Sequence, residues 1–437
     1  MFRKTILKNG LRIITVPQKE TQSLTVLVLV GTGSKYETKE INGISHFLEH
    51  MYFKGTKKRP SAMAVAETLD KVGGIYNAFT SEEYTGYFAK VDAIHFDLAL
   101  DCVSDIYLNS LLPEKEIEKE KGVISEEINM RYDHPISYVE VLWNKLLYGD
   151  QPAGWDVAGT KESVAKITRD QILNYLKSQY VAQNTIICLA GKIDERASIS
   201  KVKKYFSKIR ETRPKEKPPV IDASVNSAST LSKAEEVEKQ TEPQLLLFFK
   251  KTDQTHLAFG VRAFNLFHPQ RYAQEILGVI LGGMMSSRLF EEIRTKLGIA
   301  YYIQTTVSSD PDTGYLVTQA GVDNKNIEKA ISTILKEYRG LTQRKIPKVE
   351  LKKAKDYIKG KATLLLESSE AQASFYADQE LLENKILTPE EIFKKIDRVK
   401  VSDILKVAKD IFQPQKLNLV LIGPFKEKAI FQKLLKL

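Results

Sequence analysis

The sequence predicts an α+β fold with two tandem homologous domains, each an α/β sandwich with a mainly antiparallel sheet and helices packed on one side. First, 437 residues are too many for a single core of ordinary size. Second, a helix, a short loop and an apolar strand ending in glycine follow one another at 171–191 and again at 403–423. Between these copies the apolar signal fades into charged, Pro- and Ser-rich sequence. We therefore expect domains at 1–210 and 244–437, joined by a linker at 211–243.

The elements of the first half follow from local patterns. An Asn-Gly turn between β-forming residues predicts a hairpin over 4–16, and the apolar run Leu24–Val30 predicts a buried strand. Further patterns predict helices at 44–51, 61–72, 93–108, 114–131 and 168–179, with Thr168 as a cap, and strands at 75–79, 83–90 and 185–190. A final helix closes each half, at 199–209 and 428–435.

Composition excludes several classes of function. With 43% hydrophobic and 27% charged residues, the chain is typical of a globular protein. The net charge of +10 comes from scattered lysines, and no basic run alternates with aromatic residues, so we expect no nucleic-acid partner. The early apolar run at 24–30 is far too short to span a membrane, and no signal-peptide pattern precedes it. Cys102 and Cys188 lie in apolar segments as expected of buried thiols, which favours a cytoplasmic location.

The segment 44–51 carries the strongest chemical signal. Its apolar residues recur at helical spacing and form one face: Ile44, Phe47, Leu48 and Met51. The opposite face presents His46, Glu49 and His50. Two imidazoles one turn apart can share one Zn²⁺, and a carboxylate that does not bind the metal can accept a proton from water. The alternative is a solvated helix face on which these residues fall together by chance.

A catalytic zinc site needs a third protein ligand besides two histidines. The candidates lie in the predicted helix 114–131, where Glu127 stands 77 positions after His50 and Glu120 stands two turns before Glu127. This helix is rich in glutamate, and most of these side chains must be solvated. Spacing alone leaves Glu126 and Glu127 as alternatives for the third ligand.

The pattern His46-x-x-Glu49-His50 followed by Glu127, and the longer segment from His46 to Thr56, resemble the inverzincin peptidases. This family includes pitrilysin, the mitochondrial processing peptidase and insulin-degrading enzyme. The resemblance implies one Zn²⁺ per chain, bound by His46, His50 and Glu127. It also implies that Glu49 is the general base and that Glu120 orients a ligand imidazole.

Two further segments extend the resemblance over residues 5–435. Asn77, Ala78 and Phe79, followed by a threonine, resemble the family's edge strand, which accepts substrate as an added β-strand. Without the family, an ordinary hairpin explains these residues. Arg294 and Tyr301 match an Arg-x₆-Tyr segment that implies contact with the substrate carbonyl from the second domain. Without the family, they are a helix-end cation and a strand aromatic.

The resemblance implies a zinc endopeptidase whose two domains form a clamshell around a chamber for short unfolded peptides. One chain carries both the zinc motif and the Arg/Tyr segment, so we expect a self-sufficient homodimer. Ser137 and Val141 stand where processing peptidases carry acidic residues, which argues against presequence specificity. The alternatives are a subunit that needs a non-identical partner chain and a scaffold without catalysis. A scaffold has no chemical need for the full set of metal and substrate residues.

Overall fold

The computed structural model describes residues 2–211 and 240–436. Most of the predicted linker 211–243, from 212 to 239, lies outside the described residues. The chain divides into two compact units, and each draws on both halves of the sequence. The first unit contains the residues up to Met130, the segment that begins at Trp155, and Leu364–Leu387; the second contains Arg131–Gly154, the segment that ends at Thr363, and Thr388–Leu437.

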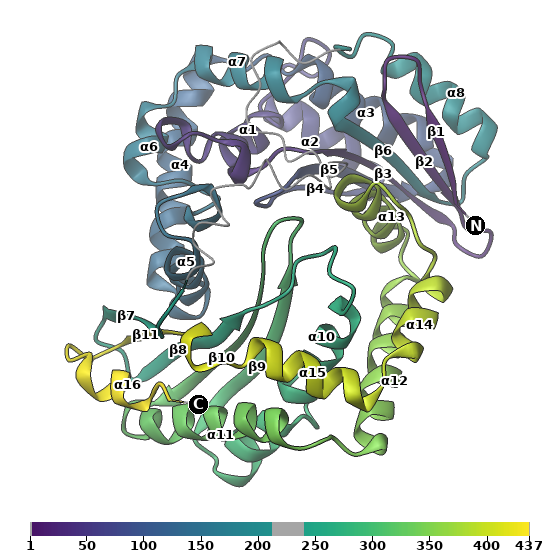
Figure 1. Cartoon of the computed structure of the whole chain (residues 1–437). Coiled ribbons are helices and arrows are strands. Elements are labelled where there is room, and N and C mark those ends of the chain that lie inside the picture. Colours follow the sequence, from purple (N-terminus) through teal and green to yellow (C-terminus); the bar gives the residue numbers. More distant parts are fainter. Residues whose placement is uncertain (1, 212–239, 437) are drawn as a thin grey trace. The chain divides into compact units, whose positions relative to one another are not determined.

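A six-stranded sheet forms the centre of the first unit (Figure 1). Its strands lie in the order β1 (Arg3–Ile6), β2 (Arg12–Pro17), β6 (Thr185–Gly191), β3 (Ser23–Val30), β5 (Thr85–Asp92) and β4 (Ile75–Thr80). Only β2 and β6 pair in parallel, and the other neighbours are antiparallel. The predicted N-terminal hairpin and the mainly antiparallel sheet are confirmed.

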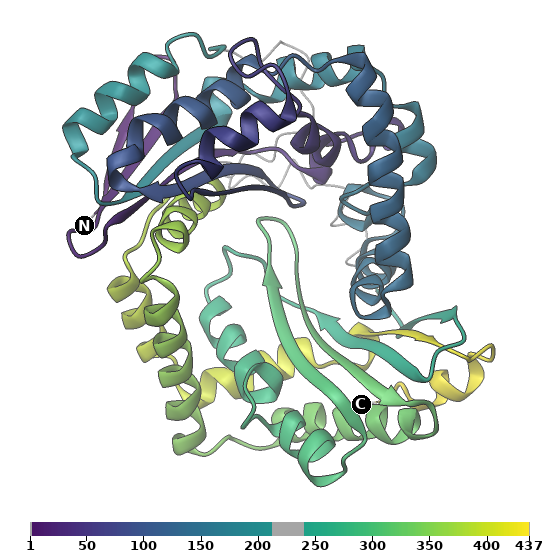
Figure 2. The same ribbon diagram turned by 180° about the vertical axis from the view of Figure 1, so that it is seen from behind.

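Among its described residues, the second unit repeats this topology, with no strand in the position of β1 (Figure 2). Its strands lie in the order β7 (Gln244–Phe249), β11 (Leu417–Gly423), β8 (Gln254–Arg262), β10 (Gly314–Asp323) and β9 (Ala300–Ser309). Again a single pair is parallel, here β7 with β11. The two sheets therefore confirm the predicted tandem architecture.

Helices cover one face of each sheet. In the first unit they are α1 (Ile44–Met51), α2 (Ala62–Asp70), α3 (Phe96–Asn109), α4 (Glu114–Asp133), α6 (Lys161–Lys166), α7 (Arg169–Gln179) and α8 (Glu195–Tyr205). In the second they are α10 (Arg271–Gly278), η6 (Val279–Gly283), η7 (Phe290–Lys296), α11 (Ile327–Gln343), α12 (Lys348–Leu365), α14 (Pro389–Arg398), α15 (Val401–Ile411) and α16 (Ala429–Leu434). Thr168 caps α7 with its side chain, as predicted.

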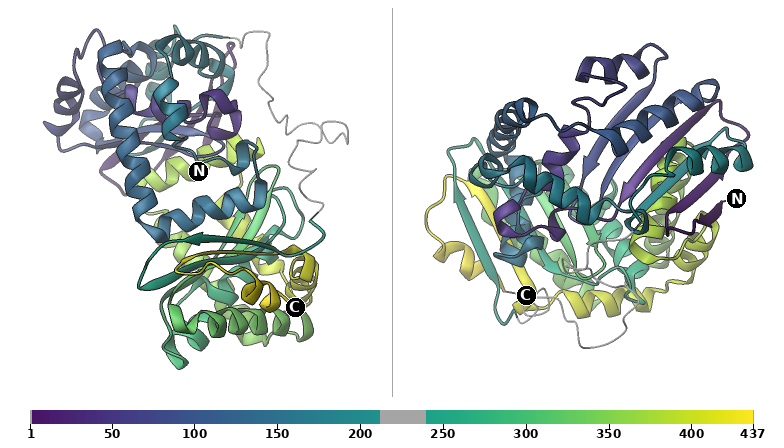
Figure 3. Two further views of the ribbon diagram at one scale, coloured as in Figure 1. Left: turned by 90° about the vertical axis from the view of Figure 1, so that its left-hand side faces the viewer. Right: turned by 90° about the horizontal axis from the view of Figure 1, so that it is seen from above.

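The opposite face of each sheet is covered by a helix from the other half of the sequence. Along β3, Val26 and Val28 face the helices of the first half, while Leu27 and Leu29 face α13 (Ser369–Glu383). The yellow-green α13 lies against this sheet (Figures 1 and 3). In the second unit, α5 (Pro135–Tyr148) packs in the same way.

The compact units therefore differ from the contiguous segments 1–210 and 244–437 expected from the sequence. The physical reason is that the central strands are apolar on both faces, so each sheet needs a helix packed on its second face as well. Cys102 and Cys188 are free and buried, as predicted. Among residues 2–211 and 240–436, no helix combines the length and apolar composition needed to cross a membrane.

Candidate metal centre

Helix α1 has the two faces that its sequence predicts. Its apolar residues are fully buried in the first core: Ile44, Phe47, Leu48 and Met51. His46, Glu49 and His50 are partly exposed on the other side. Packing of the apolar face fixes the helix, and the helix in turn fixes the direction of the two imidazoles.

The N-terminus of α1 is held by a buried carboxylate that the sequence analysis missed. Gly43, the residue before the helix, has a φ of 95°, a left-handed conformation that favours glycine. Glu37 accepts hydrogen bonds from the backbone N–H groups of Gly43 at 2.7 Å and Ser45 at 2.8 Å. Burial raises the pKa of Glu37 to about 7, against the opposing effect of these backbone donors. Capping motifs place the acceptor at the helix end, so a residue seven positions before the helix gave no local signal.

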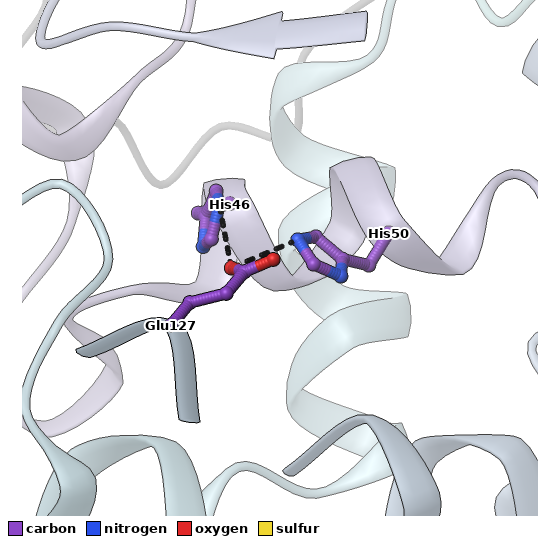
Figure 4. A group of neighbouring side chains, drawn as sticks. All are labelled: His46, His50 and Glu127. Carbon is purple, nitrogen blue, oxygen red and sulfur yellow. Dashed lines mark ion pairs between the residues drawn. The ribbon is translucent and has the colours of Figure 1, made fainter. Parts of the chain in front are cut away.

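Helix α4 brings a carboxylate to the two histidines. Glu127 Oε2 lies 3.6 Å from His46 Nε2 and 3.5 Å from His50 Nε2 (Figure 4). One ligand atom from each of the three residues lies within 4.8 Å of the others. Two ligands about 2.1 Å from a tetrahedral ion lie about 3.4 Å apart. The spacing and the donor set of two imidazoles and one carboxylate therefore fit a catalytic zinc ion, and this geometry favours Glu127 over the exposed Glu126.

The buried Glu120 connects His50 to Lys54. Glu120 Oε2 lies 3.0 Å from His50 Nδ1, and Glu120 Oε1 lies 2.5 Å from Lys54 Nζ. Burial acts to raise the pKa of Glu120, but the hydrogen bonds from His50 and Lys54 together lower it. An ionised Glu120 accepts the Nδ1 proton of His50 and leaves Nε2 free to bind a metal. The sequence predicted the role of Glu120 but no role for Lys54.

Glu49 is held by a threonine from the edge strand of the sheet. Thr80 Oγ1 donates a hydrogen bond to Glu49 Oε2 at 2.5 Å. Burial raises the pKa of Glu49, while the hydrogen bond from Thr80 opposes this change. The contact occupies one carboxylate oxygen and leaves Oε1 for other partners. The sequence placed Thr80 in the predicted edge strand beside the zinc motif but assigned its hydroxyl no contact with Glu49.

The predicted substrate-binding residues lie on β4, which ends the six-stranded sheet. Asn77 is exposed, Ala78 is buried and Phe79 is partly buried. Among the described strands, β4 pairs only with β5, so one of its edges has no strand beside it. Such an edge can accept an extended peptide through main-chain hydrogen bonds. Binding of substrate there stays a prediction.

Arg294 and Tyr301 lie in the second unit. Arg294 is exposed on η7, with its guanidinium 4.9 Å from the ring centre of Phe290. The register of β9 against β10 shifts at Tyr301, whose side chain is 75% exposed. β-Bulges of this kind are frequent beside active sites, because they redirect a side chain. The contact of both residues with substrate stays a prediction.

The fold and the donor set together define a two-unit α+β protein whose first unit carries three side chains that could hold a metal ion. Residues 12–161 match the insulinase domain of peptidase family M16, and residues 166–358 match the domain described as the peptidase M16 inactive domain. The chain therefore belongs to peptidase family M16.

Bacterial relatives match nearly the whole chain. A Bacillus subtilis protein named as an uncharacterized zinc protease is 36% identical over 97% of this chain and 98% of its own length. One from Streptomyces coelicolor with the same description is 32% identical over 98% of this chain and 90% of its own length. The crystal structure of a protease from Helicobacter pylori superposes with a TM-score of 0.87 at 25% identity, covering 97% of this chain and 99% of that one. The predicted resemblance and fold class are confirmed.

Proposed function

We propose that this chain is a zinc-dependent endopeptidase that cleaves short unfolded peptides. The observation that carries the proposal is the placement of His46, His50 and Glu127, whose histidine–carboxylate distances of 3.6 and 3.5 Å match the separation of two ligands on a tetrahedral ion. Membership of a peptidase family and relatives named as zinc proteases support it. One Zn²⁺ would be held per chain.

Zinc at this centre would supply Lewis acidity toward a peptide carbonyl and a water molecule. Glu49 accepts the proton of the attacking water and then transfers it to the leaving amine. Thr80 donates to Glu49 Oε2, which orients the carboxylate and leaves Oε1 available to exchange the proton. Glu120, with Lys54 beside it, accepts the Nδ1 proton of His50 and fixes the orientation of its ring.

The peptide itself would add to the free edge of β4, with Asn77 contacting its backbone and Ala78 and Phe79 lining its path. Arg294 and Tyr301 would stabilise the negative charge that develops on the carbonyl oxygen. A chamber between two domains would limit substrates to short unfolded peptides. We further propose a homodimeric, cytoplasmic enzyme.

The test is cleavage of a mixture of unstructured peptides by the purified chain, analysed by mass spectrometry, with Glu49→Gln as the matched control. The substitution keeps the shape of the side chain and removes the proton acceptor. We expect both proteins to contain zinc and only the wild type to cleave. If zinc-loaded wild type cleaves nothing, a single-chain peptidase is wrong, and a scaffold or a subunit that requires a partner chain takes its place. Equal rates on compact folded proteins and on peptides would refute the size limit.

A further inference from the structure

Tyr175 connects the helix of the proposed metal centre to the loop 31–36, which follows β3 and is called the β3 loop below. Tyr175 lies on the buried face of α7, one turn after Ile172. Its phenol oxygen lies 2.8 Å from Ser45 Oγ on α1 and 2.6 Å from Thr32 Oγ1 in the β3 loop. Ser45 and Thr32 are fully buried, so both hydrogen bonds lie in a low-dielectric interior, where they are stronger than in water. Tyr175 therefore ties α1 to the β3 loop.

The β3 loop in turn holds the segment that follows the edge strand β4. Ser34 N donates a hydrogen bond to Ser81 O at 3.2 Å. Ser81 is the residue directly after Thr80, whose hydroxyl donates to Glu49 Oε2. The position of the β3 loop therefore affects the contact between the edge strand and the proposed proton acceptor.

The β3 loop packs so closely against this segment that position 33 requires glycine. A Cβ atom at Gly33 would lie 2.1 Å from Ser81 O and 2.7 Å from Glu82 O, and both are backbone atoms. The backbone of Gly33 is extended, so the requirement comes from this close approach and not from a left-handed conformation. Lys35 N adds a hydrogen bond to Glu82 O at 3.0 Å. Packing of this kind leaves little room for the two segments to move separately.

We propose that Tyr175 is a positioning residue that sets the place of Thr80 relative to Glu49. The inference rests on the proposed peptidase function. One connection runs from Tyr175 through Ser45 to α1, the helix that carries Glu49. The other runs through Thr32 to the β3 loop and the residue after Thr80. Without the phenol oxygen, the two buried hydroxyls lose the partner that they share, and the loop is free to shift relative to the helix.

The experiment is a double-mutant cycle of Tyr175→Phe and Thr80→Val, measured as kcat and KM for a fluorogenic peptide. Tyr175→Phe keeps the ring and removes only the hydroxyl. Because Tyr175 acts through the contact of Thr80 with Glu49, kcat of the single variant should fall about 5-fold, with KM and zinc content unchanged. In the Thr80→Val background this contact is already absent, so Tyr175→Phe should change kcat by less than about 2-fold. Equal factors in both backgrounds would overturn the proposal.

Tyr107→Phe is the matched control. Tyr107 is also a buried tyrosine of the first core, and its phenol oxygen lies 2.8 Å from Thr185 Oγ1 on β6. This hydrogen bond involves neither α1 nor the β3 loop. The variant should therefore lower the melting temperature about as much as Tyr175→Phe and leave kcat unchanged. A fall in kcat as large as that of Tyr175→Phe would show a general effect of core stability and would overturn the proposal.

Hydrogen exchange provides a measurement that does not depend on turnover. In zinc-loaded protein, Tyr175→Phe should speed the exchange of backbone amides in the β3 loop about 10-fold, because the loop is held less firmly. Gly33→Ala should do the same, since its Cβ displaces Ser81, and Tyr107→Phe should not. Unchanged exchange in Tyr175→Phe would overturn the inference and leave the peptidase function intact, because the wild type still cleaves. A zinc-loaded wild type that cleaves nothing would overturn both proposals.

Discussion

The hydrogen bond from Thr80 to Glu49 allows the sharpest test of the proposed mechanism. Thr80→Val removes the hydroxyl that donates to Glu49 Oε2 at 2.5 Å and keeps a β-branched side chain suited to strand β4. A hydrogen bond to an ionised group contributes about 1.5–3 kcal/mol. Because Glu49 is partly exposed, we expect a value near the lower limit, or a fall of about 10-fold in kcat/KM. The loss should appear in kcat, since Thr80 contacts the proton acceptor.

The assay is steady-state cleavage of a fluorogenic peptide, with the zinc content of each protein measured in parallel. Thr80→Ser is the control, because it restores the hydroxyl and should recover most of kcat. Unchanged kcat in Thr80→Val would refute the positioning role of this contact. A serine variant as slow as the valine variant would show that packing of the methyl group matters instead. Loss of zinc in either variant would indicate a structural effect on α1.

Three further predictions concern the metal centre and the packing. Glu120→Gln should weaken zinc binding about 10- to 100-fold, as measured by competition with a chelator, because His50 loses a charged partner; Lys54→Met should show a smaller effect in the same direction. The pKa of Glu37 is raised from 4.5 to about 7 in the folded chain, so the folded state binds more protons than the unfolded state between these values. The stability of the wild type relative to Glu37→Gln should therefore fall as pH rises from 4.5 to 7; a constant difference in melting temperature across this range would contradict the assignment. Trp143→Ala should destabilise the chain by about 3–5 kcal/mol in thermal melts, because Trp143 is fully buried between α5 and the second sheet; a change under 1 kcal/mol would show that this face can repack.

Local sequence patterns predict the fold and the site correctly wherever residues close in the sequence determine the structure. The alternation along β3 and the spacing of Phe47 and Leu48 in α1 follow directly from which side of each element is apolar. The same logic predicted that His46 and His50 share the opposite face. The spacing could not distinguish Glu126 from Glu127 as the third ligand. Their side chains point in different directions from α4, and only the packing of α4 determines which of them faces the two histidines.

Contacts between segments far apart in the sequence could not be predicted from local patterns. Leu27 and Leu29 show that β3 has a second apolar face, but nothing in their sequence shows that α13 covers it. Glu37 lies before α1 in an irregular segment, and only the folded chain places its carboxylate at the helix end. Thr80 reaches Glu49 because β4 lies beside α1, a relation that depends on the order of strands.

The exchange of α5 and α13 also determines what a cut in the chain would do. The compact units are joined at four places besides the segment 212–239: after Met130, Gly154, Thr363 and Leu387. An engineered protease site within 212–239 would therefore create two fragments that each contribute a helix to the other fragment's sheet. Such a nicked protein should migrate as two bands in denaturing gels and elute as one species in native buffer. The boundary between the two halves of the sequence is therefore not a boundary at which the folded protein separates into two parts.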